Sequence, residues 1–302
     1  MVDTIEKKDR LLIFDILRIC SVFLIVAGHL AWGYTYLGES IAHIVSFLFT
    51  GGTFWFVFQT HLGMIAVYIL IFVSGAVLEY NYQSVTNFSD TMRFYIKRIL
   101  RIYPAYWMSL FLGIAIAPGL LNEPFSYLFL QFIGIQTITG DLLHNPINPM
   151  GWFIGVIICL YLLFPFLSMA IKKHPYVSLL VVTIISFILR LIFIYFPNHF
   201  PFGYFPERWF PLCSLFEFCL GIFVVRLSLY PKWVNKSNTI KFLSDISFYV
   251  FLTHFVLGTI LDIPSNFSFY IVTVCLFSYL FYLGDNTFQK WMSNKKSVSG
   301  VK

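Results

Sequence analysis

The sequence predicts an all-α fold, a polytopic bundle of transmembrane helices. Of its 302 residues, 59% are hydrophobic and only 11% are charged, far below the roughly 25% of soluble domains. Several windows of about 20 residues carry almost no charge, and that length crosses a hydrocarbon core of roughly 30 Å. The Lys and Arg residues gather in short clusters between these windows. Such clusters are typical of membrane loops, so we expect membrane lipid and no nucleic acid as a partner.

Eight apolar segments are long enough to span a membrane, at about 11–31, 62–80, 100–118, 151–170, 177–196, 209–227, 242–261 and 267–285. The first resembles a leader, but ionisable residues interrupt its apolar core, so we expect a retained helix. Two shorter apolar stretches, 41–58 and 124–138, are expected to be re-entrant or to lie on the outer surface. If both crossed instead, the bundle would have ten spans.

The sequence shows no internal repeat and no linker long enough to separate domains. We therefore expect one transmembrane domain over residues 1–288 and a short basic cytoplasmic tail over 289–302. With eight spans, every basic cluster falls on the same side, and the opposite loops contain only Arg208 among Lys and Arg. The positive-inside rule then places both termini in the cytoplasm and predicts a multi-pass protein of the cell membrane.

The cysteines and two isolated charges have ordinary explanations. Five cysteines lie mostly within apolar segments, with no C-x-x-C pair and no His at metal-ligand spacing, so they are expected to pack and no metal is predicted. Arg190 is expected to snorkel to the outer interface. Glu79 is expected to pair with a neighbouring base.

The first span carries three polar side chains, each expensive to place in lipid. Arg18 and His29 are eleven residues apart, which is within about 20° of three full turns and places them on one face, about 16 Å apart along the axis. Asp15 precedes Arg18 by three residues, a spacing that allows an ion pair on a helix surface. The face predicts a polar pathway through the membrane. In the alternative, Asp15 and Arg18 form a structural pair and His29 is an interfacial residue.

A second basic cluster runs into the third span. The segment "MRFYIKRILRIYPAYW" places Arg98 and Arg101 three residues apart on one helical face, with Lys97 beside them. As positive-inside anchors these residues would need no further function. Guanidinium forks, however, match the geometry of phosphate groups. The cluster therefore predicts a site for a phosphorylated cytoplasmic ligand.

These segments together resemble the membrane-bound acyltransferase family 3. "RICSVFLIVAGH" is similar to the R-x10-H pattern of that family, and "KRILRIYPAYW" to its R-x-x-R-x-x-P segment. Three further segments follow in the family's order: "GMIAVYILIFVSGAVL" (63–78), "GWFIGVIICLYLLFP" (151–165) and "ISFYVFLTHF" (246–255). The chain departs from many members at Ile157, where they have Glu, so any role of that carboxylate is absent. It looks like the stand-alone members, without an appended soluble domain.

The resemblance implies an O-acyltransferase that moves an acyl group, commonly acetyl, from cytoplasmic acetyl-CoA to a hydroxyl of a cell-surface glycan or glycolipid. Arg98, Arg101 and Lys97 would hold the phosphates of the acyl-CoA. Arg18 would hold the donor or stabilise charge along the path, and Asp15 would orient Arg18.

His29 is expected to act as the general base, because an imidazole titrates near neutrality. Transient acylation of His29 before delivery is the alternative that stays open. Four residues from the similar segments are expected near the substrates: His254, Trp152, Tyr161 and Ser74. Each has a structural alternative, as a packing histidine, as aromatic residues at span ends or as a small residue between close helices.

Two other function classes are open from the sequence. A transporter or flippase of a glycan or lipid precursor also carries intramembrane charges. It should show inverted repeats or broken helices in matching halves, and we find neither. A structural subunit of a polysaccharide-export complex would give no reason for the placement of Arg18, Arg98, Arg101 and His29.

Overall fold

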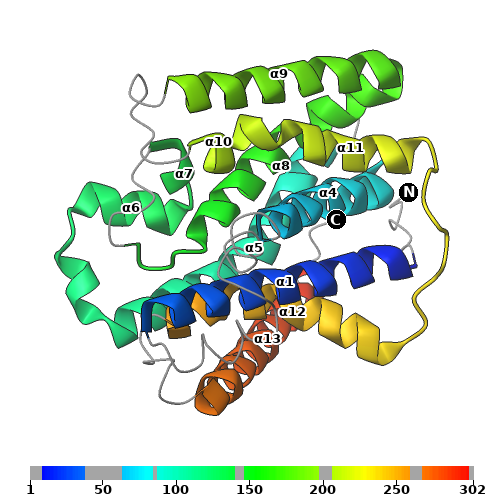
Figure 1. The fold of residues 1–302 in the computed structure, drawn as a ribbon. Helices are drawn as coiled ribbons and strands as arrows, with labels where there is room; N and C mark the ends of the chain where they lie inside the picture. Colours follow the sequence, from blue (N-terminus) through cyan, green and yellow to red (C-terminus); the bar gives the residue numbers. More distant parts are fainter. Residues whose placement is uncertain are drawn as a thin grey trace, which may run out of the picture.

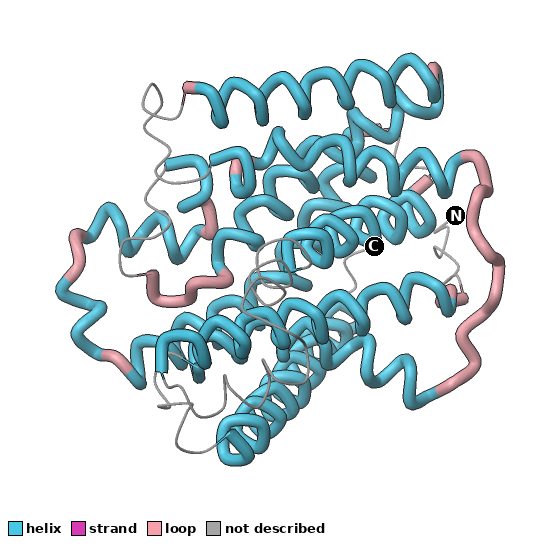
Figure 2. Tube along the Cα trace, in the orientation of Figure 1, coloured by secondary structure: helices cyan, strands magenta, loops and turns pink. Residues whose placement is uncertain are grey.

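The computed structural model describes residues 9–37, 63–83, 87–139, 146–196, 206–258 and 267–298 of the chain. Within these ranges every regular element is a helix, and the only β-type pairing is one bridge between Leu11 and Val234 (Figure 2). The long helices are α1 (Leu12–Leu37), α4 (Gly63–Tyr82), α5 (Phe88–Ile116), α8 (Gly151–Lys173), α9 (Pro175–Tyr195), α12 (Asn238–Gly258) and α13 (Phe267–Val298). These seven helices are long and apolar enough to cross a membrane. The all-α transmembrane prediction is confirmed.

Two long helices extend beyond the predicted spans. Helix α5 begins at Phe88, well before the expected start near residue 100, because Asn87 caps it by accepting a hydrogen bond from the Asp90 N–H at 2.8 Å. Helix α13 continues to Val298, through most of the segment expected to be a tail. The division into domain and tail stays a prediction.

The sixth predicted span, 209–227, is not one continuous helix. The chain there forms α10 (Pro206–Trp209), the 3-10 helix η4 (Pro211–Ser214) and α11 (Leu215–Arg226). Pro211 interrupts the helical ladder because it has no N–H to donate and restricts the residue before it. All three elements pack against α9, and Figure 1 shows α11 lying alongside that helix. At about 1.5 Å per residue, residues 206–226 extend roughly 30 Å, enough to cross a membrane.

Contacts between the helices set their relative directions. Helices α1 and α12 are parallel, since Arg18 contacts Ser244 near their starts and His29 contacts His254 nearer their ends. Helix α4 runs the opposite way, because Phe14 at the start of α1 packs with residues in the second half of α4. Helices α4 and α12 are therefore antiparallel.

This antiparallel arrangement requires an even number of crossings between α4 and α12. Helices α5, α8 and α9 supply three, so the broken unit of α10, η4 and α11 supplies the fourth. Helix α13 runs back along α12, with Tyr249 of α12 bonded to Asp285 of α13 at 2.6 Å. The described part of the chain thus passes along the bundle eight times, and α1 begins at the same end of the bundle at which α13 ends. The cytoplasmic location of that end stays a prediction.

Helices α4 and α11 touch backbone to backbone. A Cβ atom added at Gly75 would lie 2.1 Å from the Phe218 carbonyl oxygen, and one at Gly221 would lie 2.1 Å from that of Phe72. Only glycine leaves room for this approach, which is the usual role of small residues between membrane helices. Ser74, next to Gly75, has a different contact, described below with the candidate site.

The apolar stretch 124–138 does not cross the membrane. It forms the nine-residue α6 (Phe125–Ile133) and the four-residue α7 (Gln136–Thr139), both too short to span. Gly134, with φ of 71°, ends α6 in the left-handed conformation. Three aromatic side chains of α5 donate hydrogen bonds to the last carbonyl groups of α6: Tyr103 to Ile133, Tyr106 to Gln131 and Trp107 to Phe132. The other stretch, 41–58, lies outside the described residues.

Candidate functional site

Two histidines meet where α1 and α12 pack side by side. His29 Nδ1 lies 2.9 Å from His254 Nε2, and the rings meet edge to edge, with 20° between their planes and 5.1 Å between centroids. His254 is completely buried, whereas His29 is half-buried. Phe255 packs edge-on against the His29 ring at 5.0 Å, and Tyr270 donates a hydrogen bond to the His254 carbonyl. Both histidines were predicted from the sequence, but their contact was not.

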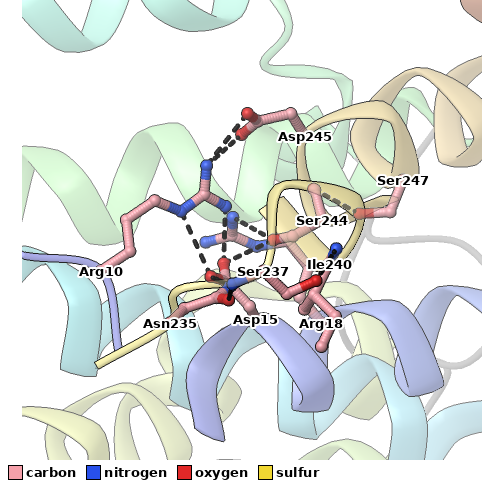
Figure 3. A network of polar contacts seen from close by, with 9 residues as sticks. All are labelled: Arg10, Asp15, Arg18, Asn235, Ser237, Ile240, Ser244, Asp245 and Ser247. Carbon is pink, nitrogen blue, oxygen red and sulfur yellow. Dashed lines mark hydrogen bonds and ion pairs between the residues drawn. The ribbon is translucent and has the colours of Figure 1, made fainter. Parts of the chain in front are cut away.

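Arg18 and Asp15 are connected indirectly. Arg18 Nη1 donates to Ser244 Oγ at 3.2 Å, and Ser244 Oγ donates to Asp15 Oδ1 at 2.7 Å (Figure 3). Asp15 forms its ion pair with Arg10 instead, at 2.6 Å. The direct pair that the spacing on α1 allowed is thus replaced by a link through α12. The hydrogen-bonded link between Asp15 and Arg18 therefore passes through the Ser244 hydroxyl.

Asp15 is the centre of a buried polar cluster that joins the start of α1 to the start of α12. Its side chain also accepts a hydrogen bond from Asn235 Nδ2 at 2.6 Å. Arg10 extends the cluster with two bonds of 2.9 Å to Asp245 (Figure 3). The backbone before α1 also pairs with residues 233–235. Burial opposes the charge of Arg10, but its bonds to Asp15 and Asp245 outweigh burial and raise the pKa of Arg10.

Arg98 and Arg101 have different surroundings on α5. Arg98 Nη2 donates to the Tyr82 hydroxyl at 2.7 Å, and the guanidinium lies over the Tyr82 ring, 5.0 Å from its centroid. The Arg101 side chain is 42% exposed and makes one long contact, 3.4 Å, with Asp285 Oδ2. A guanidinium has five N–H donors. Most of those of Arg101 are therefore unused within the described part of the chain.

Arg18 interacts electrostatically with side chains on two further helices. Its charge interacts with that of Arg101 on α5 and with the Tyr161 hydroxyl on α8. Tyr161 in turn shares a hydrogen bond of 2.7 Å with Ser74 of α4. One hydrogen bond and two electrostatic interactions thus link four residues that the sequence predicted separately, Arg18, Arg101, Tyr161 and Ser74. The histidine pair lies about 16 Å further along α1.

Two predicted site residues lie apart from these contacts. Lys97 is exposed on α5 and makes no described polar contact. Trp152, near the start of α8, packs its ring edge-on against Trp209 of α10 at 4.9 Å. Neither residue has a described direct contact with the histidine pair or with Arg18, although ring contacts connect Trp152 to His254 through Phe153 and Phe251. Among the described residues, no group of three His, Cys, Asp or Glu side chains is placed to hold a metal ion.

Two other ion pairs account for isolated charges inside the bundle. Glu79, completely buried, pairs with Arg226 of α11, as expected for a neighbouring base. Arg190 pairs with Glu217 of α11 at 2.8 Å, and only 17% of its side chain is exposed. The expected snorkelling of Arg190 is therefore wrong, because an acid on the adjacent helix holds the guanidinium between helices.

Sequence reasoning missed three participants, Arg10, Ser244 and Asp285. Arg10 is the last basic residue before the first span, and Asp285 is an acid at the end of the last. These positions were visible in the sequence, but each has a partner at least 184 residues away: Asp245 for Arg10, Arg101 for Asp285 and Asp15 for Ser244. Only the packing of helices distant in sequence identifies them.

Comparison with known proteins identifies the family of the chain. Neither the curated proteins nor the solved structures gave a match. A family model described as an acyltransferase domain matches residues 11–295, a range that includes every site residue predicted from the sequence. The chain therefore belongs to the acyltransferase family 3 and is a multi-pass membrane acyltransferase.

Proposed function

We propose that the protein is an acyl-CoA-dependent O-acyltransferase of the cell membrane. Its donor is cytoplasmic acyl-CoA, commonly acetyl-CoA, and its acceptor is a hydroxyl of a cell-surface glycan or glycolipid. The observation that carries the proposal is that the polar face of α1 has two separate parts, one at Arg18 and the other at His29. Near one end, the charge of Arg18 interacts with those of Arg10 and Arg101, and the half-buried His29 meets His254 about 16 Å further along the helix.

The donor would bind at the end of the bundle where Arg18 and Arg101 converge. CoA carries several phosphate groups, and arginine binds phosphate through charge-assisted, often bidentate hydrogen bonds. Arg101 offers most of its donors and is 42% exposed. The hydrogen bond to Tyr82 fixes the Arg98 guanidinium, which would contribute mainly its positive charge to donor binding. The clustering of basic loops at this end, under the positive-inside rule, supports its assignment to the cytoplasm.

The reacting centre would lie at His29. A hydroxyl oxygen of the acceptor attacks the thioester carbonyl carbon, and a ring nitrogen of His29 takes the hydroxyl proton. A carbon–oxygen bond forms, the carbon–sulfur bond breaks, and CoA leaves as a thiolate that takes up a proton. In the two-step alternative, His29 itself carries the acyl group between donor and acceptor. Both routes require an unprotonated nitrogen on His29.

The proposal is tested with purified protein in detergent. We expect the protein to bind CoA and to release thiol slowly from acetyl-CoA when water replaces the acceptor. A transporter or an export subunit would do neither. Mass spectrometry of surface glycans from cells with and without the gene would then identify the acceptor and the acyl group. Folded protein that neither binds CoA nor releases thiol would contradict the proposal.

A further inference from the structure

His254 contacts two kinds of partner through its two ring nitrogens. Its Nδ1 lies 2.9 Å from the Phe251 carbonyl oxygen and 3.0 Å from that of Val250. Its Nε2 lies 2.9 Å from His29 Nδ1. Carbonyl oxygens can only accept hydrogen bonds. The proton of a neutral His254 therefore belongs on Nδ1, because a lone pair there would face two other acceptors.

This arrangement determines the proton on His29 as well. With its proton on Nδ1, His254 presents a lone pair at Nε2. A bond of 2.9 Å between that nitrogen and His29 Nδ1 then requires His29 to be the donor. A neutral imidazole carries only one ring proton, so His29 Nε2 is left with a free lone pair.

We infer that His254 is a positioning residue that fixes the tautomer of His29, so that Nε2 of His29 is the nitrogen that takes the acceptor proton or the acyl group. This inference rests on the proposed function and assigns its reacting atom. His254 itself touches no substrate in this account. It replaces the carboxylate that commonly orients a catalytic histidine with a second, completely buried imidazole.

Local packing fixes the orientation of the His254 ring. Tyr270 of α13 donates to the His254 carbonyl at 2.9 Å, and Phe251 packs beside the His254 ring with centroids 6.1 Å apart. No acidic side chain among the described residues forms an ion pair with either histidine ring. A second proton on His254 would therefore place an unpaired charge inside the bundle, at high cost.

Two variants of similar size separate a tautomer role from simple packing. His254→Gln places an amide near the former Nε2, where its oxygen can accept from His29 Nδ1. His254→Asn places its amide near the former Nδ1 and offers His29 nothing. We expect the Gln variant to keep kcat within about tenfold of wild type and the Asn variant to lose on the order of 10²-fold, toward the typical worth of general base catalysis. The Michaelis constant for acetyl-CoA should stay unchanged in both.

Nitrogen-15 NMR of histidine-labelled protein gives a readout that needs no acyl donor. The shifts of the two ring nitrogens distinguish a protonated from an unprotonated site, and the signal missing from a His29→Ala sample identifies His29 among the seven histidines. We expect a protonated Nδ1 on His29 in wild type and in His254→Gln.

A proton on His29 Nε2 in the wild-type spectrum, or equal kcat losses in the Gln and Asn variants, would overturn the inference. A protonated Nδ1 in protein without any transferase activity would instead uphold the histidine pairing and contradict the proposed function.

Discussion

Arg101 offers a sharp test of donor binding, because its removal should affect the donor and leave the fold intact. Its one described contact is the 3.4 Å approach to Asp285. Asp285 keeps hydrogen bonds from Tyr249 at 2.6 Å and from Gln289 at 3.1 Å when Arg101 is replaced. The Arg101→Ala protein should therefore stay folded, with a lowered unfolding temperature because the buried Asp285 carboxylate loses its ion-pair partner. A lost hydrogen bond to a charged phosphate costs about 1.5–3 kcal/mol, which is about 10- to 150-fold in donor affinity.

The assay compares two thioester donors, acetyl-CoA and acetyl-pantetheine, which lacks the phosphate groups. Arg101→Ala should raise the Michaelis constant for acetyl-CoA by the factor given above and leave that for acetyl-pantetheine nearly unchanged. Arg93→Ala is the matched control, because Arg93 is exposed on the same helix. Its replacement should weaken acetyl-CoA binding by at most about 1 kcal/mol, the typical worth of an exposed ionic contact. Equal penalties with both donors would refute the assignment of Arg101 to the phosphates.

Three further predictions concern the bundle that holds the site. Gly221→Ala should lower the free energy of unfolding by about 1–3 kcal/mol or more, because the added Cβ would lie 2.1 Å from the α4 backbone. Gly63→Ala is the control: a Cβ there would have nothing within 4 Å, so thermal unfolding should show no change in stability. Ser244→Ala removes the link between the acid and the guanidinium of α1 and should raise the Michaelis constant for acetyl-CoA more than that for the acceptor; the reverse pattern would remove Arg18 from the donor site. In a cysteine-free background, an impermeant thiol reagent applied outside cells should label a cysteine at Glu123 and not one at Lys173, and the opposite result would invert the predicted topology.

The sequence predicted the parts of the fold that depend on one segment at a time. Hydropathy and span length identified the long helices, and the distribution of Lys and Arg indicated an even number of crossings. The break in the sixth span was harder to foresee, although Pro206 and Pro211 were visible, because an apolar run can tolerate proline when neighbouring helices satisfy the backbone. The close approach of α4 and α11 at Gly75 and Gly221 also depends on packing that periodicity does not encode.

The candidate site was predicted in its residues and only partly in its connections. The 3.6-residue period placed Arg18 and His29 on one face, and the structure keeps both on the interface of α1 with α12. The same reasoning favoured an Asp15–Arg18 pair, because it considered only α1. Arg10 competes successfully for Asp15 since the chain before α1 folds back against residues 233–235, a tertiary contact invisible to local spacing.

The role of His29 in the transfer chemistry can be measured as the rate of acetyl transfer per folded molecule of His29→Ala. We expect this rate to fall about 10²–10⁴-fold, with the unfolding temperature and CoA affinity of the same preparation near wild type. His174→Ala, an exposed histidine between α8 and α9, should change none of the three. A folded His29→Ala protein that retains more than about a tenth of the wild-type rate would contradict this role.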